Sequence, residues 1–258
     1  MSVPFASEIS FNFTAPVWEI HTWEQLLLIT TKDQDSLETR FSLVDHQRGE
    51  LIFESIGFEE DWWISAFLFN GEQIVFQLYN DTQDIEDRSV FCFDIKTEEV
   101  LWSIDGVKLQ QVNASTIGCK SIDADDSQAF LVDVATGHEI DFPKDAVIAS
   151  TAQFPYLYDS ENQYHQMLTD FLTKRGVIGF IGAIEYLEFN DLIFFGLNFE
   201  EVNTYSLKLY VYDAEGGLLL EVILEKDLKG RASGSFFILD QALIFVKDKC
   251  QLKICSIA

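Results

Sequence analysis

The chain has 258 residues, of which 48% are hydrophobic and 23% charged, a balance typical of a globular protein rather than a disordered one. Its 43 acidic and 17 basic residues give a formal net charge of −26, which repels phosphate backbones and anionic lipids, so we expect no nucleic-acid partner and no membrane partner. The four cysteines show no CxxC spacing, so we expect free buried thiols rather than a redox pair or zinc site.

Strand signals begin at the N-terminus and continue along the chain. Residues 1–13 contain neither the basic segment nor the apolar segment of a secretion signal, so we expect a cytoplasmic protein. Within them, Ile9–Phe13 alternates apolar and polar residues as a strand does. Further short apolar runs, separated by turns rich in Asp, Glu, Asn and Gly, occur at 26–30, 73–79, 192–197, 207–212 and 242–246. With only four prolines and no linker-like segment, the sequence predicts a single domain over residues 1–258.

One pattern recurs at intervals of roughly forty residues. An apolar strand, an Asp, a short polar turn and a second strand occur at four places, Asp45, Asp94, Asp133 and Asp213. The last gap is about twice the others, and Asp170 lies near its middle. The repeat therefore predicts a strand within residues 161–175, although the apolar spacing there also fits an amphipathic helix.

Four antiparallel strands in each repeat are typical of a β-propeller blade, which buries its faces only by stacking on neighbouring blades. The final strand, 251–256, has no partner after it, and Ile9–Phe13 has none before it. We therefore predict an all-β fold, a six-bladed β-propeller whose ring is closed by the N-terminal strand. Seven blades are the alternative.

Asp94, Thr97 and Trp102 resemble the tryptophan-docking repeat of quinoprotein-type β-propellers, and Asp133, Thr136 and Gly137 match part of it. The resemblance implies that Trp102, and Phe53 at the equivalent place, pack against the next blade, with the indole N–H bonded to backbone. Dehydrogenases of that family bind pyrroloquinoline quinone and calcium beside adjacent cysteines. This chain has no adjacent cysteines, so we expect no cofactor. The chain also resembles propellers that serve as assembly scaffolds and uncharacterised bacterial propeller proteins.

Candidate ligand residues lie where predicted inner strands would feed the central channel of a propeller. They are acidic, histidine or aromatic side chains: Glu19, His21, Glu60, Asp61, Trp62 and Glu185. Such an acidic, aromatic funnel could hold a cation, a sugar or a peptide. A second place for a divalent cation is the Asp-rich turn 123–127.

The sequence singles out no catalytic residue, because it contains no phosphate loop, GxSxG or HExxH motif. We therefore expect a non-catalytic interaction or scaffold module that holds a protein or peptide. The alternative is a small-ligand binder or a carbohydrate-active hydrolase or lyase, with acidic residues at the channel acting as acid and base.

Overall fold

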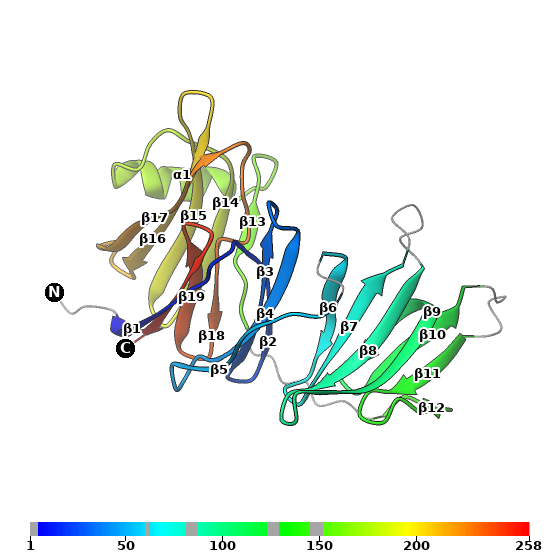
Figure 1. The fold of residues 1–258 in the computed structure, drawn as a ribbon. Coiled ribbons are helices and arrows are strands. Elements are labelled where there is room, and N and C mark those ends of the chain that lie inside the picture. Colours follow the sequence, from blue (N-terminus) through cyan, green and yellow to red (C-terminus); the bar gives the residue numbers. More distant parts are fainter. Residues whose placement is uncertain (1–4, 60–61, 81–86, 123–128, 145–151, 258) are drawn as a thin grey trace. The chain divides into compact units, whose positions relative to one another are not determined.

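The computed structural model describes residues 5–59, 62–80, 87–122, 129–144 and 152–257, and strands make up most of this part of the chain (Figure 1). Its one α-helix is α1 (His165–Lys174). The predicted all-β class is therefore confirmed. The chain divides into two compact units: a central unit, residues 18–150, and a terminal unit, residues 1–17 with 151–258. The single domain over 1–258 stays a prediction.

The central unit contains two sheets. The first has the order β2 (Val17–Trp23), β3 (Leu26–Asp33), β4 (Glu38–Asp45), β5 (Glu50–Ile56). The second runs in chain order through β6 (Ile64–Phe69), β7 (Gln73–Tyr79), β8 (Arg88–Asp94), β9 (Glu99–Asn113), β10 (Thr116–Ser121), β11 (Ala129–Asp133) and β12 (Glu139–Ile140). The long β9 pairs with β8 through residues 99–107 and with β10 through residues 107–113, so it belongs to two successive four-stranded units.

The terminal unit also contains two sheets. One has the order β13 (Tyr156–Tyr158), β14 (Phe180–Phe189), β15 (Leu192–Glu200), β16 (Tyr205–Asp213), β17 (Leu218–Leu228). The other joins β18 (Phe236–Leu239), β19 (Ala242–Lys247) and β20 (Gln251–Ile257) to β1 (Phe5–Asn12). β1 lies antiparallel to β20, with Ile9 opposite Ile254 and Asn12 opposite Gln251. The predicted pairing of the first and last strands is confirmed, while closure of a ring stays a prediction.

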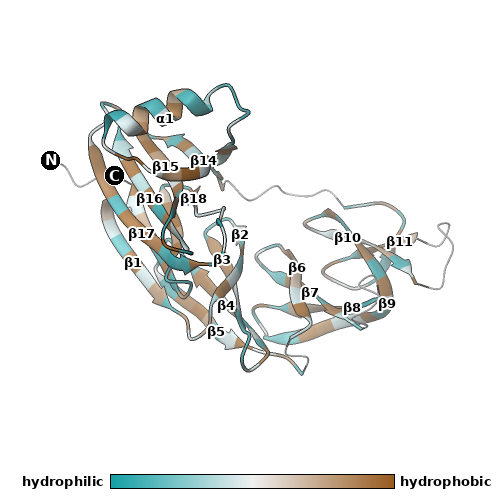
Figure 2. Cartoon of the chain, turned by 90° about the horizontal axis from the view of Figure 1, so that it is seen from above, coloured by the Kyte–Doolittle hydropathy of each residue, from teal (hydrophilic) through white to brown (hydrophobic). Residues whose placement is uncertain are grey.

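Hydrophobic residues occur along the strands, as the colouring of Figure 2 shows. In the central unit, phenylalanines from the β2–β5 sheet and from β7 and β8 meet in one cluster, where the ring centroids of Phe41 and Phe76 lie 4.6 Å apart. In the terminal unit, Phe194 of β15 and Phe236 of β18 belong to a core shared by its two sheets. Each sheet thus buries a face against a neighbouring sheet, as strands with one apolar face require.

The recurring Asp residues close turns. Asp94 Oδ1 accepts hydrogen bonds from the backbone N–H of Thr97, at 2.8 Å, and from its hydroxyl, at 2.9 Å. Asp133 and Thr136 repeat both bonds, at 2.9 and 2.7 Å. The backbone bond from Thr97, followed by the hydroxyl bond, lowers the pKa of Asp94. The repeat is therefore a turn-capping device, which explains why Asp recurs at that position.

The prediction of a strand within residues 161–175 is wrong, because this segment contains helix α1. Leu168 and Leu172, four residues apart, are buried in a cluster that includes Tyr210 and Tyr212 of β16. Asp170, the expected copy of the repeat, instead accepts a bond from Gln166 on the exposed helix surface. The apolar spacing at i and i+4 decided the secondary structure of this segment in favour of a helix, because a helix with this spacing covers the aromatic face of the β14–β17 sheet.

The blade expected around Asp170, the fourth of the six, is therefore not a set of strands. The described residues contain five four-stranded units, namely β2–β5, β6–β9, β9–β12, β14–β17 and β18–β20 with β1, and β13 lies beside β14. The blade number of six is not confirmed.

Trp102 of β9 makes the two contacts expected of a docking tryptophan, a backbone hydrogen bond and packing against the next four-stranded unit. Its Nε1–H donates a 2.8 Å hydrogen bond to the carbonyl oxygen of Val134, which follows β11 of the next four-stranded unit. Its ring covers Gly137, where any Cβ would overlap the indole, and Gly137 has a φ of +70° that favours glycine. Phe53 meets Phe93 of β8 edge-on, with centroids 6.4 Å apart. Both side chains join successive four-stranded units.

We expect Trp102→Ala to lower the free energy of unfolding of the central unit by about 2–4 kcal/mol, because a half-buried ring and its bond are lost. Trp102→Phe should cost about 1 kcal/mol, the share of the N–H bond. All five tryptophans lie in the central unit, so urea unfolding followed by tryptophan fluorescence reports on it. Leu101→Ala is the matched control, because Leu101 is 45% exposed on the same strand. Equal stability of the Trp102 and Leu101 variants would contradict this role.

Candidate functional site

Three sequence-predicted site residues meet around one lysine in the central unit. Glu19 and His21 lie on β2, and their Oε2 and Nε2 atoms are 3.3 Å apart. The ammonium group of Lys32 on β3 lies 5.0 Å from the Trp62 ring centroid and 5.7 Å from that of Trp18. It also donates a 3.3 Å hydrogen bond to the Trp62 carbonyl oxygen. We call this group, Trp18, Glu19, His21, Lys32 and Trp62, the Lys32 cluster.

The charges of the Lys32 cluster are balanced internally. The hydrogen bond from His21 lowers the pKa of Glu19, partial burial opposes this, and the charges of His21 and Lys32 add to it. Burial lowers the pKa of Lys32, while the charge of Glu19 acts in the opposite direction. The cation that an acidic, aromatic funnel would attract is thus supplied by the protein itself.

Two other candidate residues, Glu60 and Asp61, lie outside the described residues, as does the Asp-rich stretch 123–126. Among the residues that are described, no three His, Cys, Asp or Glu side chains gather to form a metal site. Within the same ranges, no helix is long and apolar enough to cross a membrane.

Glu185 lies on β14 of the terminal unit and is only 4% exposed. Its Oε2 accepts bonds from the Ser235 hydroxyl and, at 3.2 Å, from the Ser235 backbone N–H, and its Oε1 accepts the Gly234 N–H. The carboxylate is thus paired on both oxygens with the segment that leads into β18. It fixes that segment in place.

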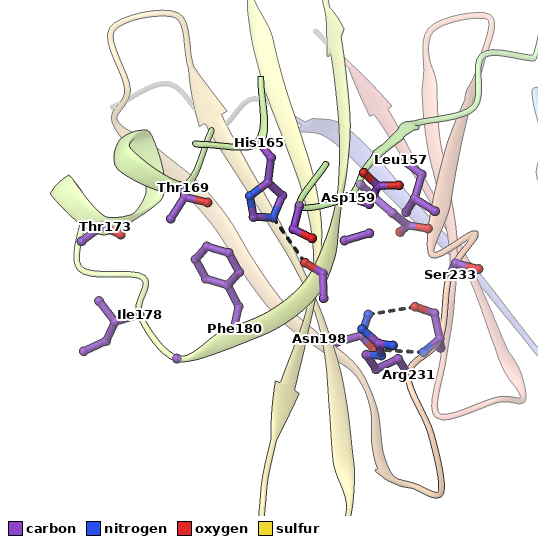
Figure 3. A pocket seen from close by; sticks show the side chains of 16 residues that line it. Leu157, Asp159, His165, Thr169, Thr173, Ile178, Phe180, Asn198, Arg231 and Ser233 are labelled. Atoms are coloured by element: carbon purple, nitrogen blue, oxygen red, sulfur yellow. Dashed lines mark hydrogen bonds between the residues drawn. The ribbon is translucent and has the colours of Figure 1, made fainter. Parts of the chain in front are cut away.

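A cavity of about 880 Å³ lies beside Glu185, wholly within the terminal unit (Figure 3). This volume is in the range of sites that hold small molecules or short peptides. The lining comes from the end of β13 and the turn after it, from α1, from residues 178–185, from β15 and from residues 231–233. Apolar and polar groups share this lining: Leu157, Ile178 and Phe180 lie among Ser160, Thr169, Thr173 and Ser233.

An irregularity in β14 helps to form the wall of the cavity. Between Ile181 and Glu185, β14 advances by four residues while its partner β15 advances by two, from Asn198 to Gly196. Gly182 and Ala183, within this bulge, line the cavity. Bulges redirect side chains and interrupt the hydrogen-bonded ladder, and they are common beside binding sites.

The segment 231–235 is held at two points. The buried Asn198 amide donates to the Ala232 carbonyl oxygen at 2.9 Å and accepts the Ala232 N–H at 3.0 Å. Glu185 holds Gly234 and Ser235 at the other end of the segment. Arg231 and Ser233 therefore face the cavity from a fixed backbone (Figure 3).

Helix α1 supplies the opposite wall. His165, Thr169 and Thr173 are spaced four residues apart, so they share one helix face, and all three line the cavity. His165 Nε2 lies 3.4 Å from the Gly182 carbonyl oxygen. Thr169 Oγ1 is buried and has no hydrogen-bond partner among the described residues.

The acidic side chains of the cavity are engaged with backbone. Asp159 Oδ1 accepts the N–H groups of Glu161, at 3.0 Å, and of Asn162, at 3.1 Å. Glu185 is engaged in the same way with Gly234 and Ser235. The arrangement suits recognition by hydrogen bonds and apolar contacts.

Of the predicted site residues, only Glu185 belongs to this cavity, while Glu19, His21 and Trp62 belong to the Lys32 cluster. Sequence reasoning missed Arg231, Asn198, His165 and Thr169. The signal for Arg231 was present in residues 228–235, "LKGRASGS", a Gly- and Ser-rich stretch with two cations in an acidic chain. The signal for His165 and Thr169 was the helical spacing that the repeat argument set aside.

The comparisons with known proteins give a family match over part of the chain and distant fold similarities. A family described as a domain of unknown function (DUF4905) matches residues 20–102. No curated protein matches.

Three solved structures illustrate the fold similarities. A member of the DUF4221 family from Bacteroides vulgatus is 8% identical, with 98% of this chain and 97% of that chain covered and a TM-score of 0.38. BamB from Moraxella catarrhalis is 10% identical, with 95% and 85% covered and a TM-score of 0.32. The β-propeller domain of the Trilobed protease from Pyrococcus furiosus is 11% identical, with 91% and 64% covered and a TM-score of 0.33, so this chain spans less than two thirds of that protein.

Proposed function

We propose that the chain is a non-catalytic β-propeller of the tryptophan-docking type that binds an extended peptide segment of a partner protein in the cavity of the terminal unit. The successive four-stranded units, the Trp102 contact and the pairing of β1 with β20 support the propeller. The cavity itself carries the binding proposal, because it combines peptide-sized volume with hydroxyl, amide and apolar groups.

The edge strand β13 favours a peptide as the ligand. β13 is the outermost strand of its sheet and pairs with β14 on one side. Leu157 of β13 lines the cavity, and both Leu157 and Tyr156 are more than half exposed. An extended peptide entering the cavity can continue along this edge by adding main-chain hydrogen bonds, a common mode of peptide recognition.

The alternative, a carbohydrate-active hydrolase or lyase, needs two carboxylates free to act on one bond. Asp159 and Glu185 both accept backbone N–H groups, which favours binding over acid–base work.

The test uses a library of N-acetylated tripeptides with free C-termini, titrated into the full chain by calorimetry. We expect Thr173→Trp, which places a large ring at the cavity wall, to weaken binding by about tenfold or more. Lys174→Trp is the matched control, because Lys174 is the exposed next residue of α1 and does not line the cavity. Equal binding by both variants would contradict the assignment of the site, and turnover of the peptides would favour the enzyme.

A further inference from the structure

We propose that Arg231 makes the cavity specific for a ligand that ends in a free carboxylate, an inference that rests on the proposed function and deepens it. The carboxylate could come from the C-terminus of a peptide or from a small organic acid such as a sugar acid.

Arg231 has no acidic partner of its own. It lines the cavity, it is exposed, and it makes no ion pair or hydrogen bond with any residue that the structure describes. The two acidic side chains of the cavity lining, Asp159 and Glu185, have oxygens engaged by backbone N–H groups. The guanidinium therefore keeps its donors for a ligand.

Neighbouring residues hold the backbone beside Arg231 and leave room for its side chain. The backbone beside it is fixed by the two bonds between Asn198 and Ala232. Its guanidinium lies against Gly182 in the β14 bulge, where a Cβ would overlap Nη1. Gly182 also has a φ of +76°, a conformation that residues with side chains rarely adopt. A side chain that starts from a fixed backbone loses less conformational freedom on binding than one on a mobile loop.

The charges around the cavity favour a single negative charge on the ligand. One guanidinium binds one carboxylate with two parallel hydrogen bonds. Asp159 and Glu185 lie in the same lining, so a dianion such as phosphate meets more repulsion than a monoanion does. Beyond the carboxylate, the apolar Leu157, Ile178 and Phe180 are available to the rest of the ligand.

The experiment measures binding of four probes to the full chain by calorimetry: the acetylated tripeptide library with free C-termini, the same library as C-terminal amides, glucuronate, and glucose. We expect the acid library to bind at least about tenfold more tightly than the amides, as loss of a charge-assisted pair implies. Arg231→Met should abolish that difference, and Arg231→Lys should retain part of it. Lys229→Met is the matched control, because it removes one positive charge from the same segment at a residue outside the cavity lining, and it should change affinity by less than about twofold.

Each outcome has a separate meaning. Preference for the acid library assigns the carboxylate to a peptide C-terminus, and preference for glucuronate over glucose without peptide binding assigns it to a small acid. Equal binding of acids and amides, or wild-type preference in Arg231→Met, overturns the carboxylate inference and leaves peptide binding standing. Absence of binding by both peptide libraries contradicts the proposed function itself.

Discussion

Removing residues 1–13 is expected to expose the edge of β20 and to destabilise the terminal unit by at least about 3 kcal/mol, since several ladder hydrogen bonds of about 0.5 kcal/mol or more are lost with their packing. β1 covers β20 from Phe5 to Asn12 and adds side-chain bonds, among them Lys253 Nζ to Glu8 Oε1 at 2.6 Å and Gln251 Nε2 to Asn12 Oδ1 at 2.7 Å. No other strand pairs with that edge of β20 among the described residues.

Hydrogen exchange followed by mass spectrometry measures this effect locally. In the shortened chain, the amides of residues 250–257 that bond to β1 should lose their protection, while the alternate amides that bond to β19, and those of β7 in the central unit, keep theirs. A synthetic peptide of residues 4–16 added in trans should restore protection, because a free strand can dock on an open edge. Unchanged protection of residues 250–257 would show that β1 does not complete this sheet.

Replacing Glu185 by Ala is expected to cost about 3 kcal/mol or more, because it leaves the N–H and hydroxyl of buried Ser235, and the part-buried N–H of Gly234, without their acceptor. Glu185→Gln should cost less, since one amide oxygen can still accept, although the NH₂ group faces another donor. Because the segment 231–235 loses one of its two anchors, the preference for carboxylate probes should also fall.

Urea unfolding separates this effect from a general loss of stability. Tryptophan fluorescence follows only the central unit, because the terminal unit has no tryptophan. Unfolding of the terminal unit is therefore followed by hydrogen exchange of its own peptides. Glu188→Ala, an exposed glutamate on the same strand, should cost no more than about 1 kcal/mol. If the Glu185 and Glu188 variants were equally stable, the carboxylate would not hold the segment.

The strands could be predicted because alternation and turn residues are local signals. The same holds for the role of Trp102, since its motif and the glycine it covers stand at fixed spacing in the sequence. The pairing of β1 with β20 could also be inferred, because an incomplete repeat at each end leaves two strands that complete one another.

Helix α1 was missed because two local signals conflicted and the repeat was given precedence. The burial of Leu168 and Leu172 against β16 is a tertiary contact that decides in favour of the helix. This error also concealed the cavity, one wall of which is α1. The Lys32 cluster could not be predicted fully, because sequence alternation places Glu19 and His21 on β2 but does not show that Lys32 of β3 reaches Trp62.

Intermolecular nuclear Overhauser effects between the bound tripeptide acids and methyl groups of the protein test the binding site most directly. The account predicts contacts to the methyl groups of Leu157, Thr169, Thr173 and Ile178, which come from three different segments and line one cavity. Contacts confined to methyl groups of the central unit, with none to these four residues, would contradict it.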